Sequence, residues 1–440
     1  MGAFSGDYLG PLGDGQTAVI IGGGPAGAAC AIALKNLAAE LGRKIEVVIY
    51  EGKTFAGEIH HNQCVGVLSP PLREIMGERL GVAFPDHLVQ TSIGGYVLHS
   101  DRRSIVLEEE GEPSYVVKRV QFDDYLLGKA REQGVRVVQC RVTDLEFAWD
   151  RVVVYSEGDN RRADVLVGAF GLDDGAIQLF QRATAPRRRD AYAPPRCLDS
   201  IVTRIYPDPD FLAGFGDRIH AFLPAMPRIE FGAVTPKHDH LTVNIAGAQV
   251  DARLMDEFLT FAPVKKVLPP SFTPSSRELA YFKGRFPVSL ARGYYNDRYV
   301  VAGDAAGLLR PFKGKGVTYG CITGIRAAET IMKEGISKAA FRGYERKSQE
   351  VLDDMIYGRI IRWLAIASAY YGFLDPVLEI AKNDHALRRA LFDAVSANKL
   401  FKEIVRDTLR PGLAARLAAA SALALLGFKP RSQGRLETGA

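Results

Sequence analysis

The feature that most constrains this chain is a glycine-rich turn between an apolar strand and a small-residue helix. Residues 17–21, TAVII, predict a buried strand, and the run GGGPAG follows directly at residues 22–27. A helix is expected to about Leu41, and a second apolar strand, residues 45–50, ends at Glu51. A G-x-G-x-x-G run in this order of strand, helix and strand ending in an acid indicates a dinucleotide-binding unit.

The glycines of this turn have separate tasks. Gly22 makes the tight turn, Gly24 lets the backbone approach a pyrophosphate, and Gly27 allows close contact between helix and strand. The carboxylate of Glu51 is expected to accept the adenosine ribose hydroxyls, and it disfavours a ribose phosphate there. This pattern does not separate NAD from FAD. The predicted cofactor contacts are Gly22, Gly24, Pro25, Ala26, Gly27 and Glu51.

A second glycine-rich segment lies in the last third of the chain. A short apolar strand, residues 299–302, leads to an acid and a loop, and a helix is expected from about Val317. An aspartate can accept sugar hydroxyls, and a helix N-terminus favours negative charge, so this segment suits a hydroxylated anionic ligand. Lys313 and Lys315 add positive charge at the same place. The alternative is an ordinary strand–loop–helix packing unit. The predicted contacts are Gly303, Asp304, Gly307, Pro311, Gly314, Lys315, Gly316 and Val317.

Between these two segments the pattern changes to alternating, turn-punctuated strands. We read residues 92–118 and about 190–290 as one antiparallel sheet whose apolar face covers the cofactor and forms a substrate cavity. The fold class expected is α/β, with a Rossmann-like domain, an interleaved antiparallel β-sheet substrate domain and C-terminal helices. The predicted domains are cofactor-binding, 15–91, 119–185 and 291–345; sheet, 92–118 and 186–290; and helical, 346–440.

Charge and cysteine usage exclude several classes of protein. The net charge of +5 is mild and spread along the chain, so nucleic acid is not an expected partner. The five cysteines form no CxxC pair, which fits a reducing compartment and argues against a zinc site. His60, His61 and Cys64 lack a fourth ligand, so no metal is expected. Residues 1–16 have no apolar core typical of a signal peptide, and a cytoplasmic protein is expected.

Two apolar segments near the C-terminus have basic flanks. They are residues 363–374 and 417–428, and neither reaches the about 20 apolar residues that a membrane span needs. An apolar helix with basic flanks can lie on an anionic membrane surface. A core or dimer-packing helix explains the same pattern equally well. Peripheral membrane association is therefore one of two open readings.

Taken in order, these motifs resemble FAD-dependent oxidoreductases of the aromatic-hydroxylase-like superfamily, and within it the geranylgeranyl reductase family, which saturates isoprenoid double bonds. The C-G-G-G-L-like run that lies beside the flavin in that family reads CVGVL at residues 64–68. The R-x-x-F-D-x-x-L run matches residues 119–126, which implies that Arg119 contacts FAD. The G-D-A-A-G-x-x-x-P-x-x-G-x-G run matches residues 303–316.

Three positions depart from the family patterns. The G-A-D-G turn of the superfamily reads GAFG at residues 168–171, so the acid that helps to dock nicotinamide cofactors is replaced by Phe170. Lys315 stands where an acid is usual and makes the cofactor pocket more positive. The aromatic Y-x-W-x-F-P run of the reductases has only a thin counterpart at residues 219–224.

The resemblance implies a two-electron flavin reductase. Hydride is expected to pass from reduced FAD to a carbon–carbon double bond of a geranylgeranyl-type lipid or another apolar small molecule. Cys64 or a bound water would supply the proton, with simple packing as the other role for Cys64. The electron donor would be NAD(P)H, a reduced partner protein or a quinol. The alternatives are a flavin monooxygenase or halogenase, and a non-catalytic redox-sensing flavoprotein.

Overall fold

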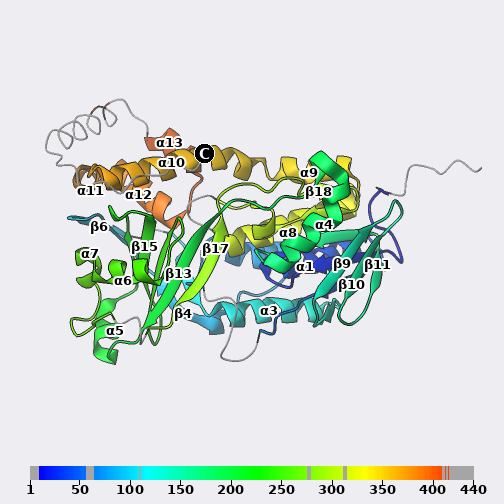
Figure 1. Ribbon diagram of the computed structural model, residues 1–440, viewed down its shortest axis with the longest axis horizontal. Coiled ribbons are helices and arrows are strands. Elements are labelled where there is room, and N and C mark those ends of the chain that lie inside the picture. The colour runs from blue at the N-terminus through cyan, green and yellow to red at the C-terminus, as the bar shows by residue number, and fades with distance from the viewer. Residues whose placement is uncertain are drawn as a thin grey trace, which may run out of the picture.

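The computed structural model describes residues 9–55, 64–108, 111–274, 279–310 and 315–408, together with residues 412 and 415. The molecule is elongated, with a nucleotide-binding lobe at one end and a large twisted sheet at the other (Figure 1). The C-terminal helices lie along one side of both parts. Residues 417–428 and the pair His60 and His61 lie outside the described residues, so the predictions made on them stay predictions.

A six-stranded sheet with a parallel centre forms the nucleotide-binding lobe. β1 (Thr17–Ile21) lies between β2 (Glu46–Tyr50) and β12 (Val165–Gly168), and both neighbours run parallel to it. A central parallel strand is covered on both faces, which explains why Ala18 to Ile21 are all apolar and all buried. The order is β18-β19-β12-β1-β2-β8. Its other strands are β8 (Arg136–Val138), β19 (Tyr299–Val301) and the antiparallel edge strand β18 (Tyr295–Asn296).

Two helices from opposite ends of the sequence pack directly on each other beside this sheet. They are α1 (Pro25–Glu40) and α8 (Gly316–Lys333). A Cβ atom at Gly324 would lie 2.2 Å from the carbonyl oxygen of Ala26, and one at Gly320 would lie 3.5 Å from the Ala26 nitrogen. Gly320 and Gly324, four residues apart in α8, therefore serve helix–helix contact. Because the backbones approach this closely, both helices begin in the same region of the molecule.

The remaining helices of this lobe cover the sheet and connect its strands. α3 starts at Arg119, the first residue of the R-x-x-F-D-x-x-L run. A small antiparallel sheet joins the lobe at its outer end (Figure 1). The helices are α3 (Arg119–Glu132), α4 (Asp174–Thr184) and α9 (Lys338–Lys347), and the small sheet consists of β9 (Val142–Phe147), β10 (Val152–Ser156) and β11 (Arg161–Ala163).

The second lobe is a mixed sheet, and the prediction of one antiparallel sheet is wrong in two respects. β14 and β5 run parallel to each other, and β7 belongs to a separate three-stranded sheet, β3-β7-β4. An alternation of apolar and polar residues shows that a strand has one buried face. It does not show which strand is its neighbour or whether the two run parallel or antiparallel. The seven strands, in sheet order, are β17 (Phe282–Pro287), β13 (Cys197–Ile205), β16 (Leu241–Gly247), β15 (Ile229–Pro236), β14 (Arg218–Phe222), β5 (Gly95–His99) and β6 (Ser104–Glu108).

Short elements complete the two lobes. Asp251 caps α6, since its side chain accepts from the backbone nitrogen of Leu254. The short strands are β3 (Val67–Leu68), β4 (Val89–Ile93) and β7 (Ser114–Val117). The short helices are α2 (Leu72–Glu74), which continues as a π-turn at Ile75–Arg79, and α5 (Pro209–Phe215), α6 (Ala252–Thr260) and α7 (Ala262–Lys265); tight single turns lie at Asp86–Leu88, Ala185–Asp190 and Gly303–Ala305.

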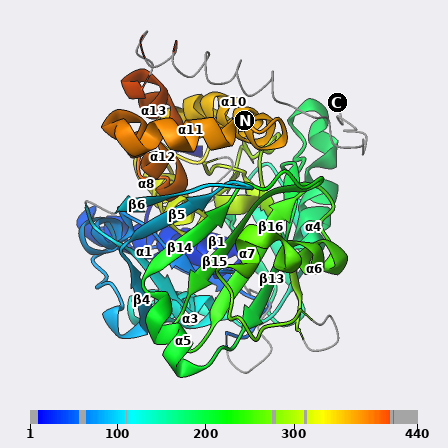
Figure 2. The same cartoon turned by 90° about the vertical axis from the view of Figure 1, so that its left-hand side faces the viewer.

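The C-terminal helices pack over the edge of the mixed sheet (Figure 2). Leu374, Leu378 and Phe392 share an apolar cluster with residues of β5 and β6. In the described part of the chain no single helix has the length and apolarity of a membrane span, and only the pair α10 and α11, bent by 105°, passes that test. The helices are α10 (Gln349–Tyr370), α11 (Leu374–Asn383), α12 (His385–Ser396) and α13 (Phe401–Thr408).

A buried ion pair holds the first of these helices to the loop that follows β19. The guanidinium of Arg310 lies 3.1 Å from the carboxylate of Asp354 in α10, and both side chains are almost fully buried. Arg310 also donates to the carbonyl oxygen of Ala397, and its guanidinium lies over the ring of Phe401. Removing either charge would leave the other buried and unpaired, so this contact fixes α10 to the body of the protein.

The parallel β5–β14 pair brings two histidines together. His99 Nε2 and His220 Nδ1 are 2.9 Å apart, and the His99 ring stacks on Phe222 at 4.5 Å between centroids. Burial, reinforced by the neighbouring His220, lowers the pKa of His99 to about 3. Burial and the positive charge of Arg218 lower the pKa of His220 to about 4.

This pair is expected to make the protein acid-sensitive. The unfolded chain takes up protons on both histidines below about pH 6.5, whereas the folded chain does not until about pH 4, so stability falls as the pH drops through that window. The slope is at most about 1.4 kcal/mol per pH unit for each histidine. When thermal unfolding is measured between pH 7 and pH 4.5, the stability of the double variant His99→Phe, His220→Leu should depend less on pH than that of the wild type. Parallel curves for the variant and the wild type would contradict this assignment.

Candidate functional site

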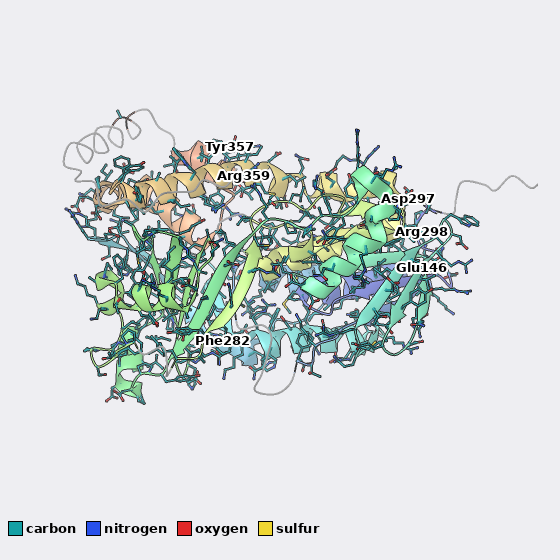
Figure 3. All side chains as sticks on the ribbon, in the orientation of Figure 1. Glu146, Phe282, Asp297, Arg298, Tyr357 and Arg359 are labelled. Atoms are coloured by element: carbon teal, nitrogen blue, oxygen red, sulfur yellow. The ribbon has the colours of Figure 1, made fainter. Side chains whose placement is uncertain are left out.

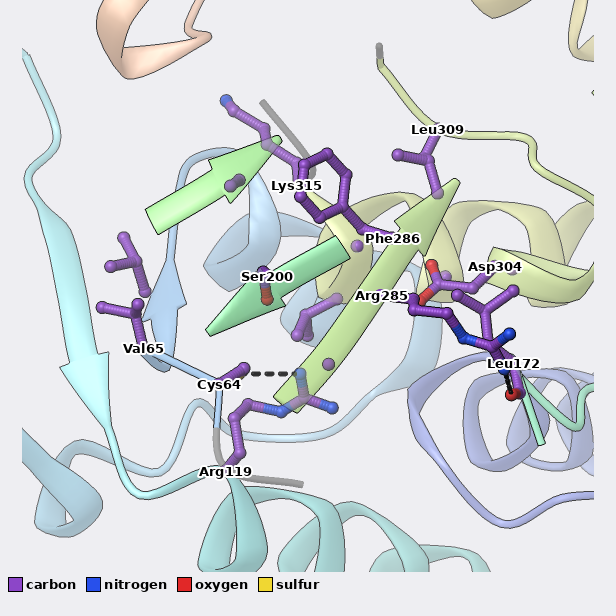
Figure 4. Close-up of a pocket in the computed structure, with 18 of the residues that line it drawn as sticks. Cys64, Val65, Arg119, Leu172, Ser200, Arg285, Phe286, Asp304, Leu309 and Lys315 are labelled. Carbon is purple, nitrogen blue, oxygen red and sulfur yellow. Dashed lines mark hydrogen bonds between the residues drawn. The ribbon is translucent and has the colours of Figure 1, made fainter. Parts of the chain in front are cut away.

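One cavity of about 1590 Å³ is lined by residues of both glycine-rich segments. Figure 4 shows the part of it around Cys64, Asp304 and Lys315. It begins at the N-terminus of α1, passes the N-terminus of α8 and continues between the mixed sheet and the C-terminal helices. Single small-molecule pockets usually span about 300–1,000 Å³, so this space is large enough for a cofactor and a second molecule. The predicted site residues that line it are Gly22, Gly24, Pro25, Ala26, Glu51, Cys64, Arg119, Gly303, Asp304, Lys315, Gly316 and Val317.

Two other predicted cofactor contacts, Gly27 and Gly307, lie outside the cavity lining. A Cβ atom at Gly27 would lie 1.9 Å from the Gly22 carbonyl oxygen, so Gly27 permits helix–strand packing. Gly307 has a positive φ of 68°, and its missing Cβ would meet the Ser289 carbonyl oxygen at 2.1 Å, outside the cavity lining. The glycine at position 307 of the G-D-A-A-G run is therefore explained by backbone packing. Pro311 and Gly314 lie outside the described residues.

At the N-terminus of α1 the cavity is open at the place where a pyrophosphate is expected to lie. A Cβ atom at Gly24 would have no protein atom within 4 Å. The first N–H groups of α1 have no acceptor within the helix, so they point towards this open space. Glu51 is almost fully buried and accepts from the backbone nitrogens of Gly23 at 2.8 Å and Lys53 at 2.7 Å. These bonds fix its carboxylate at the carboxyl end of β2, beside the cavity.

The second end combines an acid, a lysine and the N-terminus of α8. An Oδ1 atom of Asp304 lies 3.5 Å from the position of a Cβ at Gly316. Burial raises the pKa of Asp304, and the positive charge of Arg119 partly offsets this. Lys315 is also buried, and its Nζ donates to the Pro70 carbonyl oxygen at 2.7 Å. Its charge therefore lies at the cavity wall, held by the segment before α2, and the expectation that it stabilises a bound anionic ring stays a prediction.

Cys64 and Arg119 meet at the lining of the cavity (Figure 4). Arg119 Nη1 lies 3.6 Å from the Cys64 Sγ atom, and two other guanidinium nitrogens donate to Asp123 at 3.0 and 2.9 Å. Burial opposes the charge of Arg119, but the carboxylate of Asp123 outweighs it and the pKa of Arg119 is raised. The guanidinium is therefore permanently charged and fixed in direction, and the exposed thiol of Cys64 lies next to it.

Beyond these residues the cavity becomes an apolar arm between the mixed sheet and the C-terminal helices. The sheet contributes Tyr96 and Leu98 of β5 and Ile219 and Ala221 of β14. The sequence predicts the sheet side of this arm but not the helical side. The helical residues that line it are Ile361, Leu364, Ala365 and Ser368 of α10, Leu374 and Val377 of α11, and Leu391, Ala394 and Val395 of α12. The only sequence signal for them is the apolar character of residues 363–374.

Among the described residues, no three His, Cys, Asp or Glu side chains come together as metal ligands. Phe170, at the position where the superfamily has an acid, is buried and packs against Phe180 and Tyr192. Its aromatic ring thus belongs to the core of the lobe as well as to the cavity wall.

Comparisons with known proteins agree with this architecture. No family model matches the sequence. An uncharacterized protein of Methanosarcina barkeri is 24% identical over 340 residues, which cover 75% of this chain and 79% of that protein. A geranylgeranyl bacteriochlorophyll reductase-like protein from Thermoplasma acidophilum superimposes with a TM-score of 0.65 at 18% identity, over 92% of this chain and 99% of that chain.

Two other solved structures are similar to a comparable degree. A flavin-dependent brominase matches with a TM-score of 0.63 at 18% identity, over 89% of this chain and 98% of its own. A flavoprotein/dehydrogenase from Cytophaga hutchinsonii matches with a TM-score of 0.62 at 18% identity, over 94% of this chain and 99% of its own. The fold is therefore that of FAD-dependent oxidoreductases, and identities this low carry no statement about substrate.

Asp304 allows a direct test of the second end of the site. We expect Asp304→Ala to weaken FAD binding by roughly 10- to 100-fold, because a hydrogen bond to a charged group contributes about 1.5–3 kcal/mol. Fluorescence titration of the apoprotein with FAD measures this. Asp210→Ala, on the exposed surface of α5, is the matched control and should bind FAD as the wild type does. Equal affinities for wild type and Asp304→Ala would remove Asp304 from the site.

Proposed function

We propose that this protein is an FAD-dependent oxidoreductase that saturates carbon–carbon double bonds of a long apolar, isoprenoid-type molecule. The observation that carries the proposal is a single cavity that joins two glycine-rich helix starts to an apolar arm. The first part has the polar features that a dinucleotide needs. The walls that β5, β14 and the C-terminal helices contribute to the arm are mainly apolar, while Lys283 and Arg285 of β17 also line the cavity.

The residues present fit FAD at both ends. The pyrophosphate would lie on the N-terminus of α1 above Gly24, with Glu51 at the adenosine ribose. The hydroxylated and ring-bearing half would lie towards Asp304 and the N-terminus of α8. When bound, reduced FAD supplies the hydride for the reaction. The protein itself contributes binding, orientation and the exclusion of water.

Cys64 is proposed as the proton donor to the reduced double bond. Its thiol is exposed and lines the cavity, and Arg119 holds a fixed positive charge 3.6 Å away. The guanidinium can stabilise the negative charge that remains on sulfur when the proton leaves. We expect Cys64→Ala to keep FAD binding and to lose most turnover, since general acid catalysis contributes about 10²–10⁴-fold. Unchanged turnover would assign the proton to water.

The function is tested by an anaerobic assay with chemically reduced protein and a geranylgeranyl lipid. The expected result is a product that has gained two hydrogen atoms for each saturated double bond, detected by mass spectrometry. Omitting the external reductant and adding NAD(P)H, a reduced carrier protein or a quinol then identifies the physiological donor. Product that appears only with oxygen, and carries oxygen or halogen, would replace the proposal with a monooxygenase or halogenase. Tight FAD binding without turnover of any acceptor would indicate a non-catalytic flavoprotein.

A further inference from the structure

Helix α10 presents an apolar strip on the outer surface of the molecule. Ile356, Ile360, Trp363 and Leu364 have exposed fractions of 54%, 51%, 67% and 48%. Successive residues of a helix are separated by about 100°, so these four side chains fall within one arc about 100° wide. Exposed apolar residues scattered singly need no explanation, but a continuous strip of large ones indicates a contact surface.

The polar contacts of α10 lie on its other sides and hold it in place. Arg362 forms a two-pronged ion pair with Glu230 of β15, and Asp354 is paired with the buried Arg310. Figure 3 shows Tyr357 and Arg359 on the same helix, and Arg359 is the basic residue exposed at the edge of the strip. The helix is thus fixed to the body of the protein while its apolar strip faces outwards.

The apolar strip adjoins the apolar arm of the cavity. Ile361, Leu364, Ala365 and Ser368 line the arm, and on the helix they occupy the arc next to the strip. Leu364 belongs to both sets, because it lines the cavity and is 48% exposed. The arm therefore reaches the surface beside Leu364, at the edge of the strip.

We propose that the apolar strip of α10 docks on the surface of a phospholipid bilayer, with the opening at Leu364 facing the lipid. A bilayer accounts for both observations, since it covers the strip and at the same time supplies apolar molecules to the opening. A second copy of the chain, or the segment after residue 415, would cover the strip but close the opening. Large aromatic and aliphatic side chains insert at the boundary between headgroups and acyl chains, where Trp363 would lie.

The route of the substrate rests on the proposed function. If the acceptor is a long apolar lipid, it passes from the bilayer past Leu364 into the arm without crossing water. The docking itself does not depend on catalysis, so a vesicle-binding measurement can fail independently of the reductase assay. Because the strip itself consists of Ile356, Ile360, Trp363 and Leu364, insertion of apolar side chains should dominate over attraction to anionic headgroups.

The test uses the full-length, FAD-loaded protein and flotation with phosphatidylcholine vesicles. We expect the wild type to float, and Trp363→Glu and Ile360→Glu to partition about tenfold more weakly or worse, since each loses a large inserted apolar surface. Trp149→Glu is the matched control: Trp149 is 74% exposed in the β9–β10 turn, and its replacement should leave flotation unchanged. Raising the salt concentration from about 0.1 to 0.5 M should change wild-type binding little.

Three outcomes would overturn the proposal. The first is a wild type that does not float with neutral vesicles. The second is an equal loss of flotation for Trp149→Glu and Trp363→Glu. The third is a wild-type dimer that Trp363→Glu converts to a monomer without any vesicle binding, which would assign the strip to a second copy of the chain. FAD content and turnover of a short, water-soluble acceptor should be the same in wild type and Trp363→Glu, which separates this result from failure of the proposed function.

Discussion

A Gly24→Val variant is expected to fold as the wild type does and to bind no FAD. Gly24 precedes α1 with an extended backbone, φ −69° and ψ −173°, which valine adopts readily. A Cβ atom there would meet no protein atom within 4 Å, so the added Cβ takes space only from a ligand. The pyrophosphate is expected to approach the backbone at this point. The absorbance spectrum of the purified variant, before and after incubation with FAD, measures the loss.

Gly214→Val is the matched control for this variant. Gly214 lies in α5, and a Cβ atom there would also meet nothing within 4 Å, but the position is remote from the cavity lining. The control should retain FAD at the wild-type level, and both variants should have melting temperatures close to that of the wild type. Wild-type FAD content in Gly24→Val would show that the pyrophosphate lies elsewhere.

A Gly324→Val variant is expected to fail in the opposite way, through loss of the fold. The added Cβ would lie 2.2 Å from the Ala26 carbonyl oxygen and 3.0 Å from the Cys30 nitrogen, both of them backbone atoms of α1. Because neither atom can move without shifting the helix, α1 and α8 must separate. Overpacking of a core costs about 1–3 kcal/mol where side chains can adjust, and a backbone clash should reach or exceed the top of that range.

Chemical denaturation of the Gly324→Val variant checks this expectation, with Gly320→Ala as its control. A Cβ atom at Gly320 lies 3.5 Å from the nearest atom of Ala26, which is ordinary contact. The control should therefore match the wild type in stability. If Gly324→Val were as stable as Gly320→Ala, the close packing of α1 on α8 would be wrong.

The sequence predicts the nucleotide-binding lobe well because its signals are local. The strand at 17–21, the turn at 22–27 and the acid at Glu51 are adjacent in the chain, and each residue type has one physical reason at its position. The same holds for the strand before Gly303. Local rules of this kind need no knowledge of distant partners.

The features that the sequence does not reveal all depend on distant partners. β14 and β5 run parallel because the β5–β6 hairpin, which comes early in the sequence, joins the edge of a sheet whose other strands come later in the sequence. Gly307 fits a cofactor pattern, yet its requirement comes from the Ser289 carbonyl oxygen. The helical wall of the apolar arm comes from residues 361–395, whose apolar pattern is equally compatible with core packing or a membrane surface. Spacing within one segment cannot decide among such alternatives.

The central claim is that two distant glycine-rich helix starts hold opposite halves of one FAD molecule. The most direct test compares the affinities of ADP, which is the adenine half alone, and of FAD in three proteins by titration of the apoprotein. The account predicts that the wild type binds both, that Gly24→Val loses both, and that Asp304→Ala weakens FAD while ADP affinity stays unchanged. A wild type that binds neither ligand, or an Asp304→Ala variant that weakens ADP as much as FAD, would contradict it.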